Sequence, residues 1–388
     1  MKVIGVVTSP RYGKVNQETL SDIVTSKNIM DTIYDIGYEG NVSNSEALLL
    51  SAMWGAANEG AEVELIYPGD PIPKFDGVVL STPVYFGDRS SILHDFINNV
   101  DLKDKAVGVV SVGAKRNGGQ ETTNIYALYD CLDKGAVITG NGPPTAQYGG
   151  TGWAGNKTAI VNDDFGIKTS YGTGRQVAKL SEILKAAESD KTPNIMFVVV
   201  TKELVDMKLI ESFKGSNVEV VDITSNYIRR CVACPICPNG DLKKDYKCII
   251  TNDDMAKVHG PLLHADCIIF VSGTNDTNFQ VFMERCRFIR RDHFELSERM
   301  YSSVSKTTSV TDILPLRIMT NMLRQNMFGL PFFKEYKGHR NITIPTYVKM
   351  IEKYTKKSIT VRQASGTDFK YTAVGYEDAK INEKAYRD

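Results

Sequence analysis

Short apolar runs alternate with amphipathic segments along the first half of this 388-residue chain. Five of these runs have the length of buried strands, at residues 2–7, 61–66, 78–80, 106–111 and 136–138. Apolar residues at helical spacing follow them; Leu93, Phe96 and Ile97, for example, come after the third run. Strands that alternate with helices in this way predict an α/β fold built on a doubly wound parallel sheet.

The same pattern starts again after a polar linker at residues 188–193. Apolar runs at 194–200, 218–222 and 267–271 form a weak internal repeat of the first half. We therefore expect two tandem flavodoxin-like doubly wound parallel sheets.

Polar segments set the expected domain boundaries. The first domain is expected at 1–187, a degenerate second copy at 194–335 and a C-terminal extension at 336–388. Residues 14–42 are interpreted as an insertion in the first domain, and the stretch Gly172-Thr173-Gly174-Arg175 is expected to lead into its closing helix.

A loop with unusual chemistry follows the third run: it reads Thr82-Pro83-Val84-Tyr85-Phe86-Gly87. Open α/β sheets bind ligands at the carboxyl ends of their strands. The loop offers backbone amides, aromatic side chains and a glycine that permits close approach. This combination suits a flat heteroaromatic ring with polar edges, which we interpret as a flavin. Tyr85 and Tyr148 would stack on or border the ring, with a packing role as the alternative for each.

Two serine-containing triplets offer groups that bind phosphate. Ser9-Pro10-Arg11 follows the first run, and Ser43-Asn44-Ser45 precedes a helix expected to reach Asn58. If residues 14–42 are an insertion, the triplets form one loop with hydroxyls, a guanidinium and free amides at a helix N-terminus. The alternative is an ordinary serine-capped helix after a turn.

A third loop, rich in glycine, follows the fourth run and contains Gly113, Gly118, Gly119 and Gln120. In this order the three loops resemble those of the NADPH-dependent FMN reductase superfamily, including its NAD(P)H:quinone oxidoreductases of the Trp-repressor-binding type and its iron–sulfur flavoproteins. The resemblance covers residues 1–187. The chain departs from the family in the insertion at residues 14–42 and in Lys115-Arg116-Asn117. The second departure would change which electron donor docks.

The resemblance implies FMN as the cofactor. It assigns the phosphate cradle to Ser9, Arg11, Ser43, Asn44 and Ser45. It assigns the isoalloxazine contacts to Thr82, Pro83, Val84, Tyr85, Phe86 and Gly87, together with Gly113, Gly118, Gly119 and Gln120. Because a flavin carries the redox chemistry itself, we nominate no catalytic acid or base. The second copy lacks both the serine–arginine loop and the Thr-Pro-Val-Tyr turn, so a second flavin site is not expected.

Four cysteines lie close together in the second half. Cys231, Cys234 and Cys237 form two CxxC steps that share the middle cysteine, and Cys248 follows at a distance. This spacing predicts a four-cysteine site for a [4Fe–4S] cluster or tetrahedral zinc. The motif resembles that of the iron–sulfur flavoproteins, which favours the cluster. Zinc, or cysteines that pack as small hydrophobic residues without metal, are the alternatives.

Charge and hydropathy limit the other function classes. Lys and Arg together number 46, equal to Asp and Glu, so no general basic footprint for nucleic acid is present. The basic stretch Arg285–Arg291 is interpreted as a solvated helix face. No apolar run approaches the ~18 residues that cross a bilayer, and the first residues show no cleavable signal pattern. We expect a cytoplasmic protein with no nucleic-acid or membrane partner.

The leading hypothesis is an FMN-dependent oxidoreductase of the NAD(P)H-dependent type, in which FMN in the first domain exchanges electrons with a [4Fe–4S] cluster in the second. Its partners would be a small-molecule or protein electron donor and acceptor, and a homodimer is expected. One alternative is an NAD(P)H-dependent quinone or flavin reductase whose second domain is structural. Another is a non-enzymatic redox partner protein.

Overall fold

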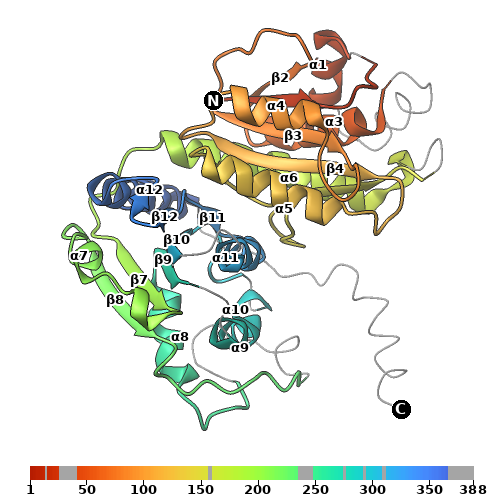
Figure 1. Ribbon diagram of the computed structural model, residues 1–388. Coiled ribbons are helices and arrows are strands. Elements are labelled where there is room, and N and C mark those ends of the chain that lie inside the picture. Colours follow the sequence, from red (N-terminus) through yellow and green to blue (C-terminus); the bar gives the residue numbers. More distant parts are fainter. Residues whose placement is uncertain are drawn as a thin grey trace, which may run out of the picture.

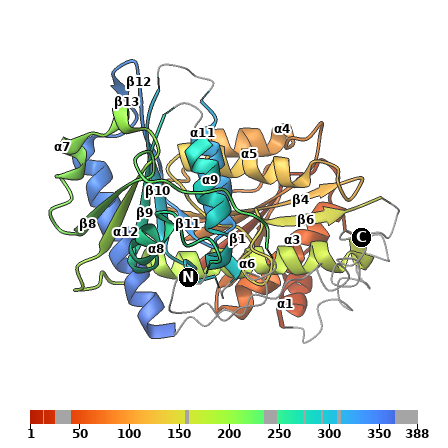
Figure 2. The ribbon, with the colours of Figure 1, turned by 90° about the horizontal axis from the view of Figure 1, so that it is seen from below.

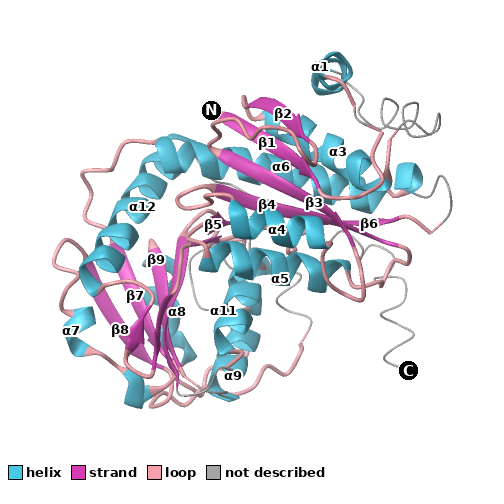
Figure 3. Ribbon diagram, turned by 45° about the horizontal axis from the view of Figure 1, so that its top comes forward, coloured by secondary structure: helices cyan, strands magenta, loops and turns pink. Residues whose placement is uncertain are grey.

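The computed structural model describes residues 1–13, 15–25, 42–155, 160–234, 248–273, 277–291, 294–307 and 312–365. The strands in these residues form one thirteen-stranded sheet with helices on both faces (Figures 1 and 3). The two halves of the chain lie side by side along this sheet (Figure 2). The α/β class is therefore confirmed.

The first half has the strand order of a flavodoxin. Its strands are β1 (Lys2–Val7), β2 (Glu62–Ile66), β3 (Gly77–Pro83), β4 (Ala106–Gly113), β5 (Val137–Ile138) and β6 (Gly150–Trp153). Its helices are α1 (Gln17–Thr25), α3 (Asn44–Asn58), α4 (Ser91–Asn99), α5 (Gln120–Asp133) and α6 (Asp164–Lys185), with a 3₁₀ turn at Ile160–Asn162. The spatial order β2-β1-β3-β4-β5 is parallel throughout, and β6 pairs with β4 beyond the end of β5.

The second half repeats this order. Its strands are β7 (Asn194–Val199), β8 (Asn217–Asp222), β9 (Cys267–Ser272), β10 (Met300–Thr307), β11 (Phe328–Gly329), β12 (Phe333–Tyr336) and β13 (His339–Arg340). Its helices are α7 (Met207–Ile210), α8 (Met255–His264), α9 (Thr277–Arg285), α10 (Arg287–Arg291), α11 (Leu314–Leu323) and α12 (Ile344–Ser365), with a 3₁₀ turn at Lys202–Leu204. The order β8-β7-β9-β10-β11 matches that of the first half, and β12 pairs with β10 as β6 pairs with β4.

One antiparallel contact joins the two halves into a single sheet. β5 pairs with β11 through Ile138 and Gly329, so the last core strands of the two repeats lie edge to edge. The apolar pattern predicts the repeat but gives no sign of this joint, since both strands are only two residues long. The domain boundaries proposed from the sequence stay a prediction.

Each face of the sheet has its own hydrophobic core, because successive side chains of a strand point to opposite faces. Val3 and Val7 of β1 belong to one core, and Ile4 and Val6 belong to the other. The first core is covered by helices that include α3, α6 and α12, and the second by helices that include α4, α5 and α11. Both cores continue from one half into the other.

Two segments outside the predicted sheets contain helices that pack on the core. Part of the expected insertion is helix α1, whose Leu20 and Ile23 are buried against α3 and β2; residues 14 and 26–41 lie outside the described residues. Part of the expected C-terminal extension is α12, whose Tyr347, Ile351 and Tyr354 are buried in the first core. In the described part of the chain, no helix is both long and apolar enough to cross a membrane.

The closing helix of the first half begins earlier than predicted. The stretch around Gly172 and Gly174 was expected to precede this helix, which is wrong, because α6 begins at Asp164 and contains both glycines. Helix packing explains their presence: a Cβ at Gly174 would lie 1.7 Å from the carbonyl oxygen of Ala52 in α3. Glycine lets the two helices approach backbone to backbone, at a cost of about 1 kcal/mol in helix propensity.

Candidate functional site

Three loops of the first half leave the sheet at one edge. β1 and β3 pair with Val7 beside Ser81, and β3 and β4 pair with Pro83 beside Val112. The loops that follow these parallel strands therefore meet at the carboxyl edge. The chain goes from β1 to β2 on one side and then to β3 on the other. Such a reversal of strand order is where open α/β sheets bind ligands.

Buried hydroxyl groups hold the first two loops together. Thr8 donates its backbone N–H (3.0 Å) and its hydroxyl (2.7 Å) to the carbonyl of Ser81. Ser90, the N-cap of α4, donates its hydroxyl to the carbonyl of Thr8 at 2.7 Å. Ser81 donates its own hydroxyl to the carbonyl of Ser45 at 2.7 Å. These bonds fix the first turn of α3 against the ends of β1 and β3.

The structure brings together the two triplets predicted to bind phosphate. Ser9 is buried and its hydroxyl accepts the N–H of Arg11 at 3.1 Å, while Arg11 is exposed. Ser43 is the N-cap of α3, and its hydroxyl accepts the N–H of Glu46 at 3.2 Å. The loop is therefore a serine-capped helix start, and such a start also carries the positive end of the helix dipole. That Ser9, Arg11, Ser43, Asn44 and Ser45 bind phosphate stays a prediction.

A buried carboxylate that the sequence analysis did not single out joins these two segments. Oε2 of Glu46 accepts the N–H groups of Gly13 and Ser43, each at 2.7 Å. Its Oε1 accepts the hydroxyl of Tyr67 at 3.1 Å. Burial, followed by the charge of Glu46, raises the pKa of Tyr67. The capping-box spacing of Ser43 and Glu46 ahead of an apolar run was the sequence signal for this role.

The loop after β3 presents aromatic side chains at the same edge. Phe86 is fully exposed, with a relative accessibility of 109%, and has a φ of 53°. Tyr85 is half exposed and exchanges two backbone hydrogen bonds with Asp88, at 2.7 and 3.0 Å. Gly87 completes the turn with a φ of 81°. This tight turn offers two aromatic faces to a ligand at the carboxyl edge.

The glycine-rich loop after β4 touches this aromatic turn. Gly119 has a φ of 99°, and a Cβ there would lie 2.8 Å from the Cα of Gly87. The side chain of Gln120 is used inside its own loop. Its Nε2 donates to two backbone carbonyls at 2.6 and 3.0 Å, and its Oε1 accepts the N–H of Gly118 at 2.8 Å. Gln120 therefore orders the loop in which Gly113, Gly118 and Gly119 lie.

Arg89 fastens the aromatic turn to the helices beside it. Its guanidinium pairs with Asp130 of α5 and with Asp88 at 3.2 Å, and it lies 3.1 Å from Nδ1 of His94. Burial raises the pKa of Asp130, and the charge of Arg89 opposes this rise. The sequence gives no sign of this role for Arg89, because its partner in α5 is distant in the chain.

Arg116, one of the departures from the family pattern, holds the glycine-rich loop. It pairs with the buried Asp163, which caps α6, and donates to the carbonyl of Thr151 at 3.1 Å. Its guanidinium lies 5.7 Å from the ring centre of Phe165. A cavity of about 340 Å³ lies beside this loop, lined by Arg116, Gly119 and Phe165 among others.

Tyr148 lies at the junction between the two halves. It shares a cavity of about 510 Å³ with Cys231, Arg287, Arg290 and Arg324 of the second half. The guanidinium of Arg324 lies 5.8 Å from its ring centre, and Arg290 donates to the carbonyl of Thr145 at 2.7 Å. Arginines of the second half thus hold the loop after β5, and the cysteine loop lies next to it.

Three of the four predicted metal ligands lie among the residues that the structure describes. Cys231, Cys234 and Cys248 are partly exposed, and Cys237 lies outside the described residues. Sγ of Cys231 accepts the N–H of Ala233 at 3.4 Å. Among the described residues, no three His, Cys, Asp or Glu side chains are grouped closely enough to hold a metal ion.

A buried ion pair joins the two chain segments that carry these cysteines. Arg285 of α9 pairs with Asp253, and their side chains are 1% and 0% exposed. The guanidinium also donates to the carbonyl of Arg229 at 3.0 Å and to Sγ of Cys248 at 3.6 Å. Burial acts to raise the pKa of Asp253, but hydrogen bonds from Arg285 and from backbone amides hold it below its usual value. The interpretation of Arg285 as part of a solvated helix face is therefore wrong.

The other three cysteines have a different environment. Cys131, Cys267 and Cys286 are fully or almost fully buried, and burial raises the pKa of each thiol, for Cys267 to about 12. Such thiols stay protonated and pack as small hydrophobic groups. Among the six cysteines that the structure describes, the three that are partly exposed all belong to the predicted cluster motif.

The chain is similar to known proteins in sequence and in structure. The sequence model of the NADPH-dependent FMN reductase family matches residues 1–126. An iron–sulfur flavoprotein of Methanocaldococcus jannaschii is 32% identical over 198 residues, covering 48% of this chain and 100% of the relative. An iron–sulfur flavoprotein of Methanosarcina thermophila is 25% identical over 204 residues, covering 48% and 97%. The solved structure of RosB with a bound flavin intermediate aligns at 12% identity with a TM-score of 0.34, covering 50% of this chain and 88% of RosB.

Proposed function

The chain belongs to the NADPH-dependent FMN reductase family, and from this premise we propose that it couples FMN in its first half to a [4Fe–4S] cluster in its second half. It is an FMN-dependent oxidoreductase. The finer proposal, that electrons pass between the two groups within one chain, rests above all on one observation. Tyr148 of the flavin-binding half and Cys231 of the cysteine motif line the same cavity.

The residues of the first half fit an FMN phosphate. The N-terminus of α3 supplies the positive end of a 15-residue helix, with Ser9 and Ser43 beside it and the exposed Arg11 free to turn toward an anion. The carboxylate of Glu46 would repel a phosphate, but its oxygens accept the N–H groups of Gly13 and Ser43 and the hydroxyl of Tyr67. Glu46 therefore orders the segments at Gly13 and Ser43, which form the phosphate cradle.

The two loops in contact at Gly87 and Gly119 fit the isoalloxazine ring. Phe86 and Tyr85 would bind its flat face, and backbone amides of the glycine-rich loop would bind its polar edge. When bound, FMN supplies hydride and single-electron transfer. The protein orients the ring through these loops, and Arg89 and Gln120 keep the loops rigid.

The donor chemistry of the second half fits an iron–sulfur cluster. Thiols are the ligands that such clusters use, and N–H groups directed at their sulfur atoms stabilise the thiolate form. Cys231 and Cys248 both accept such hydrogen bonds, from Ala233 and Arg285. We propose that Cys231, Cys234, Cys237 and Cys248 hold the cluster, and that NAD(P)H is the electron donor.

An anaerobic absorbance spectrum with iron and sulfide analysis tests this proposal. We expect the two bands of a flavin plus a broad shoulder that dithionite bleaches. Cys234→Ala should lose the shoulder and the iron but keep FMN, whereas Cys286→Ala, which alters a buried cysteine outside the motif, should keep both. If the wild type contains FMN without iron and Cys234→Ala oxidises NADPH at the wild-type rate, the coupling is wrong and the second half is structural. Bound FMN without any NADPH oxidation would instead indicate a redox partner protein.

A further inference from the structure

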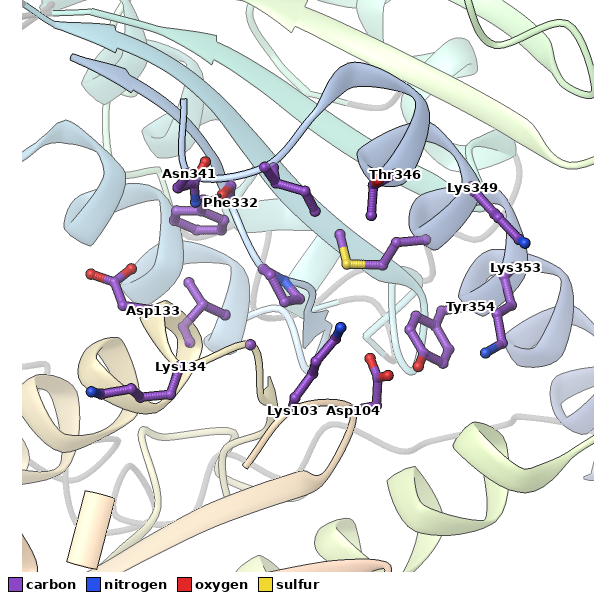
Figure 4. Close-up of a pocket in the computed structure, with 15 residues that line it drawn as sticks. Lys103, Asp104, Asp133, Lys134, Phe332, Asn341, Thr346, Lys349, Lys353 and Tyr354 are labelled. Atoms are coloured by element: carbon purple, nitrogen blue, oxygen red, sulfur yellow. Dashed lines mark hydrogen bonds between the residues drawn. The ribbon is translucent and has the colours of Figure 1, made fainter. Parts of the chain in front are cut away.

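A cavity of about 580 Å³, whose lining residues are shown in Figure 4, lies between the two halves. From the first half it is lined by the turn before β4, at Lys103 and Asp104, and by the turn before β5, at Lys134 and Gly135. These turns lie at the amino edge of the sheet, opposite the carboxyl edge with its candidate flavin site. The second half contributes Pro331, Phe332 and one side of α12.

The charges around this cavity are unbalanced. Four lysines line it, Lys103, Lys134, Lys349 and Lys353, against two aspartates. Asp133 pairs with Lys334 at 2.5 Å. Asp104 stays in the cavity beside Tyr354, whose pKa is raised by burial and then by this carboxylate. Within the residues that the structure describes, none of the four lysines forms an ion pair.

Helix α12 concentrates positive charge along one side of the cavity. Lys349, Lys353 and Lys357 follow each other at four-residue spacing and therefore lie on one face of the helix, where like charges repel. Lys357 donates to the carbonyl of Leu184 at 2.8 Å, and its pKa is lowered by burial and then by Lys353. Thr346, in the first turn of α12, also lines the cavity, so the positive end of the helix dipole adds to the charge. An anion would relieve this repulsion.

Apolar groups form the rest of the wall. Phe332, Ile342 and Met350 line the cavity together with the ring of Tyr354. Figure 4 shows Lys103 extending into the middle of the space, with Lys353 and Tyr354 on one side and Phe332 across from them. Lys134 turns its ammonium group away from the centre in the same view. The cavity thus combines an aromatic wall with two ammonium groups that come from different halves of the chain.

We propose that this cavity is a second binding site, for an organic anion with a flat apolar body, of the size of an aryl phosphate. The phosphate would bind between Lys103 and Lys353, and the body would pack on Phe332 and Tyr354. Because these residues come from both halves, the bound anion would link the amino edge of the first half to α12. The site is independent of the FMN and cluster sites.

Binding of 1-naphthyl phosphate to the full-length, FMN-loaded protein tests this site, with the neutral 1-naphthol as the matched probe. We expect saturable binding of the phosphate by calorimetry and a higher melting temperature, with much weaker binding of naphthol. Lys103→Gln and Lys353→Gln should each weaken the phosphate about tenfold, since each removes a hydrogen bond to a charged group. Lys356→Gln, on the same helix but outside the cavity lining, should bind as the wild type does.

Three results would overturn the proposal. Equal binding of naphthol would show that charge plays no part, and absence of saturable binding would show that there is no site. Release of FMN by naphthyl phosphate, followed through the flavin absorbance, would place the probe in the flavin site instead. A failure of FMN to bind at all would contradict the proposed function, and the same titrations of the wild type and the lysine variants, made on the FMN-free protein, would still test this cavity.

Discussion

The two halves of this protein share a strand order but differ in the loops that follow the strands. β2-β1-β3-β4-β5 and β8-β7-β9-β10-β11 are the same arrangement, with β6 and β12 in equivalent places. The first half places hydroxyls, aromatic rings and glycines at its carboxyl edge, whereas the second carries its cysteines between β8 and α8. The buried side chains of the strands determine the strand order. A repeat can therefore keep this order while the residues of its loops change to bind a different group.

The loop after β7 illustrates the difference. Where the first half has its serine–arginine triplet, the second has a 3₁₀ turn at Lys202–Leu204. Thr201 accepts the N–H of Gly273 at 3.0 Å through its hydroxyl, and the neighbouring Asp206 pairs with Lys306 at 3.1 Å. Thr201 and Asp206 are thus used in contacts within the protein, and the absence of a second flavin site stays a prediction.

The largest effect is expected from the buried ion pair of the second half. Arg285→Met leaves the carboxylate of Asp253 buried without its partner, which costs about 3–5 kcal/mol. We expect a matching loss in the free energy of unfolding, measured with urea, and a loss of bound iron with FMN retained. Lys257→Met, which removes an exposed ion pair to Asp254, should change little. Equal stability of Arg285→Met and the wild type would refute the role of Arg285 as the link between the cysteine segments.

The corresponding buried group of the first half is Glu46. Glu46→Ala leaves the N–H groups of Gly13 and Ser43 without their acceptor, at a cost of about 1–3 kcal/mol, whereas the hydroxyl of Tyr67 keeps the carbonyl of Val15 at 3.4 Å. We expect lower stability and weaker FMN binding by fluorescence titration, with iron content unchanged. Glu62→Ala, at an exposed site, is the control. Unchanged FMN affinity in Glu46→Ala would separate this segment from the phosphate site.

Phe86 should affect binding without affecting stability. Its side chain is fully exposed, so Phe86→Ala should leave the urea midpoint unchanged. Loss of an aromatic stacking partner should weaken FMN about three- to tenfold. Tyr126→Ala, which removes an exposed ring on α5, should leave FMN affinity unchanged. An effect of the same size from both variants would remove Phe86 from the site.

The smallest effect is a pH dependence located in the second half. His259 is buried in α8, and burial lowers its pKa below 6.5. The unfolded chain therefore binds a proton on this side chain at higher pH than the folded protein does. The stability contributed by neutral His259 is present above pH 6.5 and is lost as the pH falls toward the folded pKa. His259→Gln should reduce the fall in melting temperature over this range; an identical fall in variant and wild type would contradict the assignment.

The sequence predicted the strands that read as apolar runs, and with them the edge where the three loops meet. It did not predict β10, whose sequence is MYSSVSKT. Ser302 and Ser303 are buried there because their hydroxyls bond to the carbonyls of Pro331 and Phe270, at 2.9 and 3.2 Å. A strand whose polar groups are satisfied by distant residues has no apolar signature in the sequence.

The candidate site shows the same limit. Residues such as Phe86 and Gly119 were found because their loops follow predicted strands. Arg285 has the sequence context of a surface residue, since its partner Asp253 and the thiol of Cys248 are distant in the sequence. Residues that act through long-range contacts therefore become visible only in the folded chain.

The most direct test of the account is rapid mixing of the anaerobic protein with NADPH, with flavin and cluster absorbance followed together. In the wild type we expect flavin bleaching followed by cluster bleaching within a single turnover. In Cys248→Ala we expect the flavin to be reduced without the second phase, and NADPH oxidation in the presence of an added one-electron acceptor to collapse. Reduction of the flavin by NADPH and its reoxidation by that acceptor, both at the wild-type rate in Cys248→Ala, would contradict electron transfer between the two halves.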